Sequence, residues 1–324
     1  MTMTELDIHA DDYALTVHTS QDILECMKKG KLDSISVLTN MSCSGACMEL
    51  LAKTVPELPF LPAMSVHLDF VEGKCLAGSG EVPLLARKES DYIGLSWGKL
   101  FLLSFLPGKR KTAKAQLKKE IRAQIAAGQK EIVRCMKIAE EHGIPCKQKG
   151  LRIDAHQHAH MIPVVWEALT EVIEEERYPV EYIRNSKEVL GVFLSDGSLR
   201  KTYRPVNFIK NRLLYLLSFK VDRYAKDHAM QRMYLWGLVM SGRMDYDRIV
   251  RLYPSMAAKA EKEHRILEFC IHPGRMLVEE VTKEVDAQAA DDFYLSPDRA
   301  VEKDAVMRLS DGACALLGRR KNIL

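Results

Sequence analysis

Residues 151–163, LRIDAHQHAHMIP, combine the features that decide the fold class: a short apolar run, a cluster of histidines and the beginning of a helical pattern. The same order recurs along the chain, with short apolar runs that lead into loops rich in acidic or histidine side chains and are followed by helical segments. Alternation of this kind predicts parallel strands that are connected by helices.

Seven short apolar runs are candidate strands, and seven longer stretches have helical periodicity. The candidate strands are 6–9, 34–38, 63–68, 151–155, 180–184, 233–240 and 266–271. The helical patterns are 20–30, 44–54, 111–142, 161–177, 208–229, 245–260 and 297–308. This number of alternating elements favours an α/β fold, an irregular (β/α) barrel with parallel strands and outer helices, over a small doubly wound sheet.

We expect residues 1–324 to form a single domain with one inserted region. The inserted loop region covers about 71–110 and contains six glycines but no convincing strand-and-helix unit. A long loop after a barrel strand is typical of a lid or a substrate loop. The clearest helix, 111–142, has an apolar face at helical spacing, and Gly143 and Pro145 end it. This pattern predicts an amphipathic helix on the outside of the barrel.

Composition excludes several classes of protein. The 324 residues are 47% hydrophobic and 28% charged, as in ordinary globular proteins, and 47 basic residues nearly balance 44 acidic ones. This balance argues against nucleic acid or an anionic membrane as the main partner. The start of the chain lacks the pattern of a signal peptide, and the apolar run Leu100–Pro107 is too short to span a bilayer. Eight cysteines without a CxxC pair suggest reduced thiols, so we expect a cytoplasmic protein.

Four groups of chemically active residues follow or end candidate strands. They are the pair Asp11 and Asp12, the lone His67, the cluster 156–160 and His272. In parallel α/β folds, ligands bind at the carboxyl ends of the strands. We therefore expect these residues, although remote in sequence, to converge on one site.

The cluster contains three alternating histidines, His156, His158 and His160. Such residues share one face only if the segment is extended. Imidazole is a common ligand of divalent transition metals, so the cluster suggests a metal site. Alternatively, some of these rings form hydrogen bonds in the interior or face solvent. One or two histidines of such a cluster usually orient a ligand or position substrate, and spacing does not choose among the three.

The remaining groups allow two interpretations each. The adjacent carboxylates of Asp11 and Asp12 repel each other unless a cation or a shared proton relieves the repulsion, but such pairs are also common as helix caps. A lone strand histidine such as His67 is more often structural than a ligand. His272 precedes the turn-forming Pro273-Gly274, which places its imidazole at a strand end, where it could act as a general acid or base.

One carboxylate and two imidazoles would form a mononuclear metal site with open positions. A metal in such a site acidifies a water and polarises a carbonyl oxygen, while a nearby carboxylate takes the proton of the water. A neighbouring imidazolium can then protonate the leaving amine. These parts describe hydrolysis of an amide or an ester.

Four motifs, in this order, resemble those of the YdjC-like carbohydrate deacetylase family. Residues 9–14 (HADDYA) resemble N-A-D-D-F-G, and Ser65-Val66-His67-Leu68 with Glu72-Gly73-Lys74 is similar to the second motif. Residues 153–163 closely match L-D-S-H-x-H-x-H-M-x-P, and Ile271-His272-Pro273 resembles a late C-H-P element. The third motif is specific, and the four together extend over residues 9–274.

The resemblance implies a distorted (β/α) barrel that removes an N-acetyl group from an amino sugar or a short chito-oligosaccharide. By position, Asp12, His67 and His156 would bind one divalent metal ion, Asp11 would be the base and His272 the candidate acid. The family usually has magnesium, although these donors equally suit zinc, cobalt or manganese. The implied partners are a small carbohydrate substrate and, in many members, a second copy in a homodimer.

Further residues are candidates for orienting a ligand or binding substrate. They are His9, His158, His160, Arg184 and Trp97. Arg184 could meet a polar substrate group or pair with an acid. Trp97, together with Tyr92, could stack on sugar rings, although buried aromatics are equally common.

Two departures from the family pattern leave other functions open. His9 replaces an asparagine, which could alter the hydrogen bonding of Asp11. Ala14 replaces a glycine, which predicts a different backbone path. The alternatives are a metal-dependent hydrolase of another amide, ester or phosphoester and a non-catalytic metal-dependent sugar-binding protein. A purely structural role would make the clustering of Asp and His at strand ends a coincidence.

Overall fold

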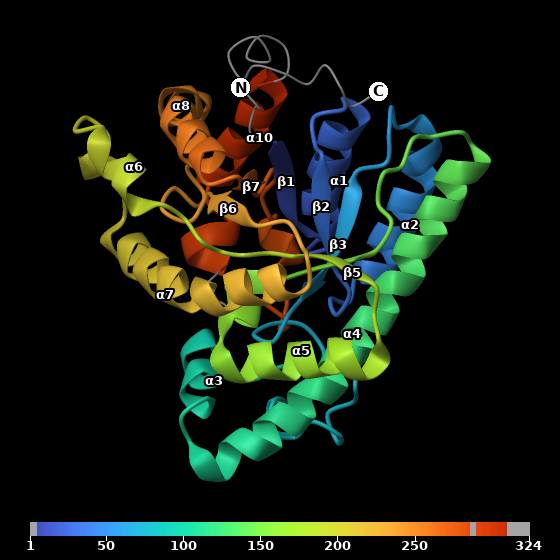
Figure 1. Cartoon of the computed structure of the whole chain (residues 1–324). Coiled ribbons are helices and arrows are strands. Elements are labelled where there is room, and N and C mark those ends of the chain that lie inside the picture. The colour runs from blue at the N-terminus through green and yellow to red at the C-terminus, as the bar shows by residue number, and fades with distance from the viewer. Residues whose placement is uncertain (1–4, 286–289, 310–324) are drawn as a thin grey trace.

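The computed structural model describes residues 5–285 and 290–309, and its centre is one sheet of seven strands. All strand pairs are parallel, and the strand order is β5-β4-β3-β2-β1-β7-β6. The strands are β1 Leu6–Tyr13, β2 Ser34–Leu38, β3 Ala63–Leu68, β4 Leu151–Ala155, β5 Val180–Ile183, β6 Met233–Trp236 and β7 Ile266–Ile271. The sheet curls into an open half-barrel with helices around it (Figure 1), which confirms the predicted α/β class and barrel-like architecture.

Four of the seven strands have the predicted bounds, and the two clearest deviations have local causes. β1 continues to Tyr13, so the acidic pair lies inside the strand rather than after it. Its register against β2 shifts between Ala10 and Tyr13, and Asp12 has a φ of 67° there. β6 ends at Trp236, four residues earlier than predicted, because Gly237 has a φ of 148° and lies against the carbonyl of Cys270.

Helices cover the outer face of the half-barrel. They are α1 Val17–Lys28, α2 Ser44–Thr54, α3 Trp97–Leu103, α4 Pro107–Glu141, α5 Pro163–Glu176, α6 Leu190–Ser195, α7 Pro205–Asp227, α8 Tyr246–Lys262 and α10 Asp298–Leu309. Proline at the first turn starts α4, α5 and α7, and side-chain caps from Thr16 and Asp245 start α1 and α8. Short 3-10 or π segments occupy Val55–Glu57, His156–Met161, Arg200–Thr202, Val278–Glu280 and Ala290–Tyr294.

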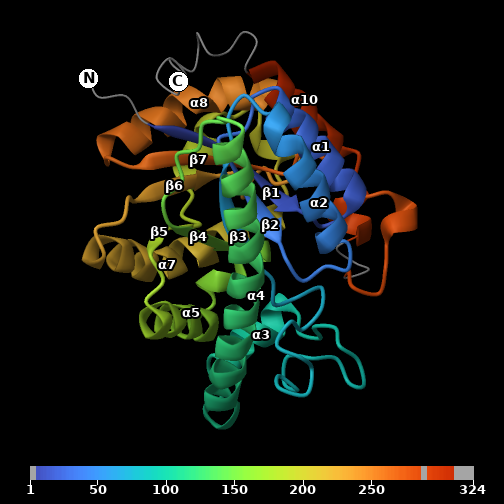
Figure 2. The ribbon, with the colours of Figure 1, turned by 90° about the vertical axis from the view of Figure 1, so that its right-hand side faces the viewer.

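The long helix α4 packs directly on the strand that carries His67. At Gly128 the helix approaches so closely that a β-carbon would lie 2.7 Å from a methyl group of Val66. The predicted apolar face of this helix is buried, including Leu117 and Ile121. Figure 2 shows α4 running along the sheet and continuing past it toward α3. The helix thus supports β3 at one end and the inserted region at the other.

The inserted region is held to α4 by buried polar side chains. Glu120 accepts hydrogen bonds from the backbone N–H groups of Leu76 and Ala77, both at 3.0 Å. Gln124 pairs with the backbone of Asp69, accepting at 2.8 Å and donating at 2.6 Å. The region predicted as a loop also contains the short helix α3 and the beginning of α4.

The segment after β5 partly closes the gap between the edge strands β5 and β6. The Lys187 carbonyl accepts a hydrogen bond from the Leu235 N–H at 3.0 Å. The buried carboxylate of Glu188 accepts three backbone N–H groups from residues 237–239. An irregular strand edge therefore replaces a regular strand at this point of the barrel.

Among the described residues, no helix combines the length and the apolar character needed to cross a bilayer. The seven described cysteines are free thiols, and Cys314 lies outside the described residues.

Candidate metal centre and active site

Three side chains from neighbouring strands converge at the carboxyl end of the sheet. Asp12 lies near the end of β1, His67 in β3, and His156 directly after β4. Asp12 Oδ1 is 3.0 Å from His156 Nδ1 and 3.6 Å from His67 Nε2. All three residues are at most 4% exposed. Their donor atoms lie close enough together to hold one metal ion.

The tautomer of His67 is fixed by a strand neighbour. Its Nδ1 donates to Asp154 Oδ1 at 2.7 Å, and Asp154 in turn accepts a hydrogen bond from Ser36 at 2.5 Å. Once the ring is neutral, as a metal ligand must be, this bond would leave the lone pair on Nε2. Nε2 is buried and has no hydrogen-bond partner among the described residues. A histidine held this way by a carboxylate is the usual arrangement of a metal ligand.

The orientation of His156 depends on the C-terminal part of the chain. Its Nε2 lies 2.7 Å from the hydroxyl of Tyr294, which donates to Glu72 Oε2 at 3.0 Å. Because that hydroxyl donates its proton to Glu72, its oxygen can accept the Nε2–H of His156. This arrangement would leave Nδ1 of His156, which faces Asp12, free to bind a cation.

The carboxylate of Asp12 is held from the side opposite to the histidines. Arg299 in α10 donates to Oδ2 of Asp12 at 2.5 Å, and the arginine is fully buried. Burial alone would raise the pKa of Asp12, but the charges of His156 and Arg299 keep that pKa well below its usual range. Asp12 is therefore ionised and directs Oδ1 at the two imidazoles.

The two histidines bind protons tightly when no metal is present. Burial would lower the pKa of His67, but the carboxylates of Asp154 and Asp11 raise the pKa to about 10. Burial would likewise lower the pKa of His156, but Asp12 raises it to about 9. A metal ion would have to displace these protons, so its affinity should increase with pH.

Asp11, the predicted base, is held by Arg184. Two arginine nitrogens donate to the two oxygens of Asp11, each at 2.7 Å. Burial would raise the pKa of Asp11, but the charge of Arg184 outweighs it and keeps the pKa well below its usual range. Arg184 also donates to Glu268 at 2.6 Å and is fully buried. Of the two roles considered for this arginine, the structure places it in an ion pair with acids.

His272, the candidate acid, lies beside Asp11 rather than beside the three proposed ligands. Donor atoms of Asp11, Cys270 and His272 lie within 4.8 Å of one another. The ring of His272 is also 3.4 Å from Glu302, which accepts the backbone N–H of His272 at 2.7 Å.

The histidine cluster forms a turn, not an extended strand. Gln157 and His158 have φ values of 51° and 57°, so the three histidines do not share one face. His158 Nδ1 is 2.9 Å from the hydroxyl of Ser186. His160 Nε2 donates to the backbone carbonyl of Arg184 at 2.8 Å and is fully buried, so it supports the arginine.

The two departures from the family pattern have structural explanations. His9 is fully buried and lies between the hydroxyls of Ser34 and Ser36, at 2.7 and 2.6 Å, with Asp11 3.4 Å away. It is therefore enclosed by strand hydroxyls and lies against Asp11. Ala14 has a φ of 70°, in the left-handed region that favours glycine. Ala14 thus adopts a backbone conformation that glycine would favour at this position.

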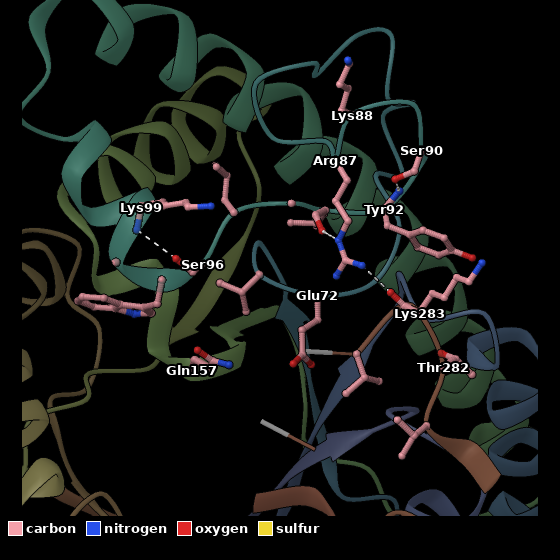
Figure 3. A pocket seen from close by; sticks show the side chains of 18 of the residues that line it. Glu72, Arg87, Lys88, Ser90, Tyr92, Ser96, Lys99, Gln157, Thr282 and Lys283 are labelled. Carbon is pink, nitrogen blue, oxygen red and sulfur yellow. Dashed lines mark hydrogen bonds between the residues drawn. The ribbon is translucent and has the colours of Figure 1, made fainter. Parts of the chain in front are cut away.

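A pocket of about 1390 Å³ opens beside this centre, between the inserted region and residues 281–285 (Figure 3). Glu72 and Gln157, which neighbour His156 in space or sequence, form part of its wall. Trp97 and Tyr92 also line it, and Trp97 is only half-buried. The inserted region therefore contributes to a cavity next to the candidate centre.

Several residues of the centre were not predicted from the sequence. Asp154 and Glu72 belong to motifs that were recognised, so their positions beside histidine motifs were an available signal. Tyr294 and Arg299 come from a C-terminal segment in which no pattern indicated a functional role. Only the fold brings that segment to the carboxyl ends of the strands.

Comparison with known proteins places this geometry in a family. A family model described as YdjC-like protein matches residues 5–310. The chain is also similar to the crystal structure of a "putative cellobiose-phosphate cleavage protein" from Enterococcus faecalis V583, with 17% identity, a TM-score of 0.57, and coverage of 98% of this chain and 96% of that chain. At this identity the likeness shows the fold alone. No curated protein matches the chain. Because the family model spans nearly the whole chain, this protein belongs to the YdjC-like family.

Proposed function

We propose that this chain is a metal-dependent hydrolase that removes an N-acetyl group from an amino sugar or a short chito-oligosaccharide. The observation that carries the proposal is the convergence of Asp12, His67 and His156, with donor atoms facing one another at 3.0 and 3.6 Å. In each of these side chains, the polar atom that does not face the shared position forms a hydrogen bond with another residue. These residues are Asp154, Tyr294 and Arg299. Preorganised donors of this kind favour a cation site over a structural polar cluster.

The residues present fit a divalent ion. His67 Nε2 is a buried polar atom without a hydrogen-bond partner among the described residues, which is costly unless something binds it. One carboxylate and two imidazoles suit zinc, and magnesium is the ion implied by the family resemblance. When bound, such an ion would polarise the acetyl carbonyl and make a water more acidic.

Asp11 and His272 would move the protons. Arg184 keeps Asp11 ionised, and the bidentate pair fixes its direction. Its carboxylate would take the proton of the attacking water, whose acidity a bound ion would increase. His272, close to Asp11, would donate a proton to the nitrogen that leaves as the free amine. The two residues together would complete the hydrolysis of a C–N bond.

The pocket suggests how substrate binds. Trp97 and Tyr92 offer aromatic faces for a pyranose ring. Five basic residues line the same pocket, namely Arg87, Lys88, Lys99, Lys210 and Lys283, against the single carboxylate of Glu72. This imbalance favours a second candidate substrate, an acetylated oligosaccharide that carries a phosphate group. The name of the structural neighbour, which refers to a cellobiose phosphate, agrees with such a substrate.

The decisive experiment measures acetate release from acetylated chito-oligosaccharides, with and without a phosphate group, after adding zinc or magnesium. Asp11→Asn should abolish turnover, and Asp222→Asn, in an ion pair with Arg265, serves as the matched control. Robust acetate release by Asp11→Asn would remove Asp11 as the base. Sugar binding without turnover under every metal would instead support a binding protein, and turnover of a phosphoester alone would support the other hydrolase function.

Two further expectations accompany this function. The free thiols support a cytoplasmic location. The family resemblance suggests a homodimer, which the hydrodynamic size of the purified protein would test.

A further inference from the structure

A distinct surface lies at the corner between α3 and α4. Leu102, Phe105 and Leu106 expose 60%, 61% and 46% of their surface there. Figure 1 shows this corner at the lower end of the molecule, well away from the sheet. Contiguous large apolar side chains at a projecting corner are unusual on a protein that meets only water.

The same corner concentrates positive charge. Residues 92–119 contain seven lysines or arginines and no acidic residue. Arg110, Lys114, Lys118 and Lys119 pair with glutamates of α5 or of the inserted region. Lys99, Lys109 and Lys111 have no side-chain partner in the described part of the chain. The near balance of charge over the whole chain conceals this local excess.

We infer that the α3–α4 corner docks on an anionic lipid surface. Apolar side chains that enter the interface, surrounded by lysines that meet anionic headgroups, are the recognised pattern of peripheral membrane attachment. The local charge is complementary to anionic lipid but not to a second copy of this corner. In a two-fold dimer through this corner, the unpaired lysines of both copies would face each other.

The docked orientation has a consequence for the pocket. Ser96 and Trp97 in the pocket wall begin α3, and the exposed side chains lie at its other end. A helix of seven residues spans about 10 Å, so the pocket would lie near the membrane surface. A substrate carried on a lipid would then be within reach.

The test is co-sedimentation of the purified protein with vesicles of phosphatidylcholine alone or mixed with phosphatidylglycerol. The protein should bind the mixed vesicles, and high salt should weaken binding. Phe105→Ser with Leu106→Ser should lower binding by more than about tenfold, as should Lys109→Gln with Lys111→Gln. All four side chains are exposed, so these variants should remain folded.

A matched control uses the far end of the same helix. Val133 is 61% exposed and Lys137 lies one turn later, so Val133→Ser with Lys137→Gln removes one exposed apolar group and one lysine charge away from the corner. This control should bind vesicles like the unmodified protein. Failure of the unmodified protein to bind anionic vesicles would overturn the inference, as would equal loss in the control. A dimer that dissociates in the Phe105→Ser/Leu106→Ser variant would assign the corner to a second copy instead.

Discussion

At the scale of single residues, the centre consists of donors whose second polar atom is already occupied. Asp154 holds His67, Tyr294 faces His156, and Arg299 holds Asp12. These contacts determine which atom of each side chain faces the metal position. Metal affinity should therefore depend on residues that never touch the ion.

Tyr294→Phe tests this dependence with the loss of one hydroxyl. Without the oxygen that lies 2.7 Å from Nε2, His156 is no longer held in the tautomer that leaves Nδ1 free. Zinc affinity, measured by isothermal titration calorimetry, should fall by about tenfold or more. Tyr203→Phe is the control, because that buried hydroxyl has no hydrogen-bond partner among the described residues. Equal affinities in the two variants would contradict the role of Tyr294.

His9 makes the stability of the fold sensitive to acid. Burial and the charge of Arg184 lower the pKa of His9 from 6.5 to about 4, so the folded protein keeps this ring neutral. The resulting stability is complete above the unfolded pKa of 6.5 and is lost as pH falls toward 4. When the pH is lowered from 7 to 5, the free energy of unfolding of the unmodified protein should fall by about 2 kcal/mol more than that of His9→Asn.

Urea unfolding of both proteins at these two pH values measures the difference. Other groups contribute to acid sensitivity in both proteins, so only the difference between their losses reports on His9. Identical losses would show that the buried ring accepts a proton without cost.

At the scale of elements, the strands were predictable and the contacts of the helices were not. Short β-branched or apolar runs gave four strands their observed bounds, because a strand buried on both faces leaves a continuous apolar signal. A helix reveals its apolar face but not the strand on which that face packs. Gly128 had no sequence signal, although it sets the contact between α4 and β3.

Gly128→Ala should destabilise the protein even though alanine favours a helix. Its β-carbon would lie 2.7 Å from Val66, next to His67, and the resulting crowding should cost about 1–3 kcal/mol. Gly45→Ala in α2 is the control, because nothing lies within 4 Å of its β-carbon position. That variant should be neutral or up to about 1 kcal/mol more stable. In thermal unfolding, the midpoint temperature should fall for Gly128→Ala and stay the same or rise for Gly45→Ala. Stabilisation by both variants would contradict the close packing.

The contribution of α10 can be tested through Arg299. Arg299→Leu leaves the buried Asp12 carboxylate without its arginine, which should cost about 3–5 kcal/mol. Saturating zinc should reduce the difference in the free energy of unfolding between Arg299→Leu and the unmodified protein, because the metal supplies the missing positive charge. Arg265→Leu breaks the ion pair with Asp222. Its loss of unfolding free energy, relative to the unmodified protein, should be the same with and without zinc. Urea unfolding of both variants and of the unmodified protein, with and without zinc, measures these losses. If the loss in Arg299→Leu did not change with zinc, Asp12 would not be a ligand of the metal.

At the scale of the whole molecule, the sheet converts a scattered set of residues into one centre. The strand order places β1, β2, β3 and β4 side by side, so residues 12, 67 and 156 meet at the same end. The sequence predicted this convergence from the rule that ligands bind at the carboxyl ends of parallel strands. The sequence could not predict that the C-terminal segment contributes to the centre. The positions of Tyr294 and Arg299 depend on the path of the chain after β7, for which no sequence pattern gave a signal.

The most direct test of the central claim is the anomalous scattering of zinc in crystals of the purified protein. The account predicts one peak within about 2.0–2.2 Å of Asp12 Oδ1, His67 Nε2 and His156 Nδ1. A peak among Asp11, Cys270 and His272 instead, or no peak at saturating zinc, would contradict the account.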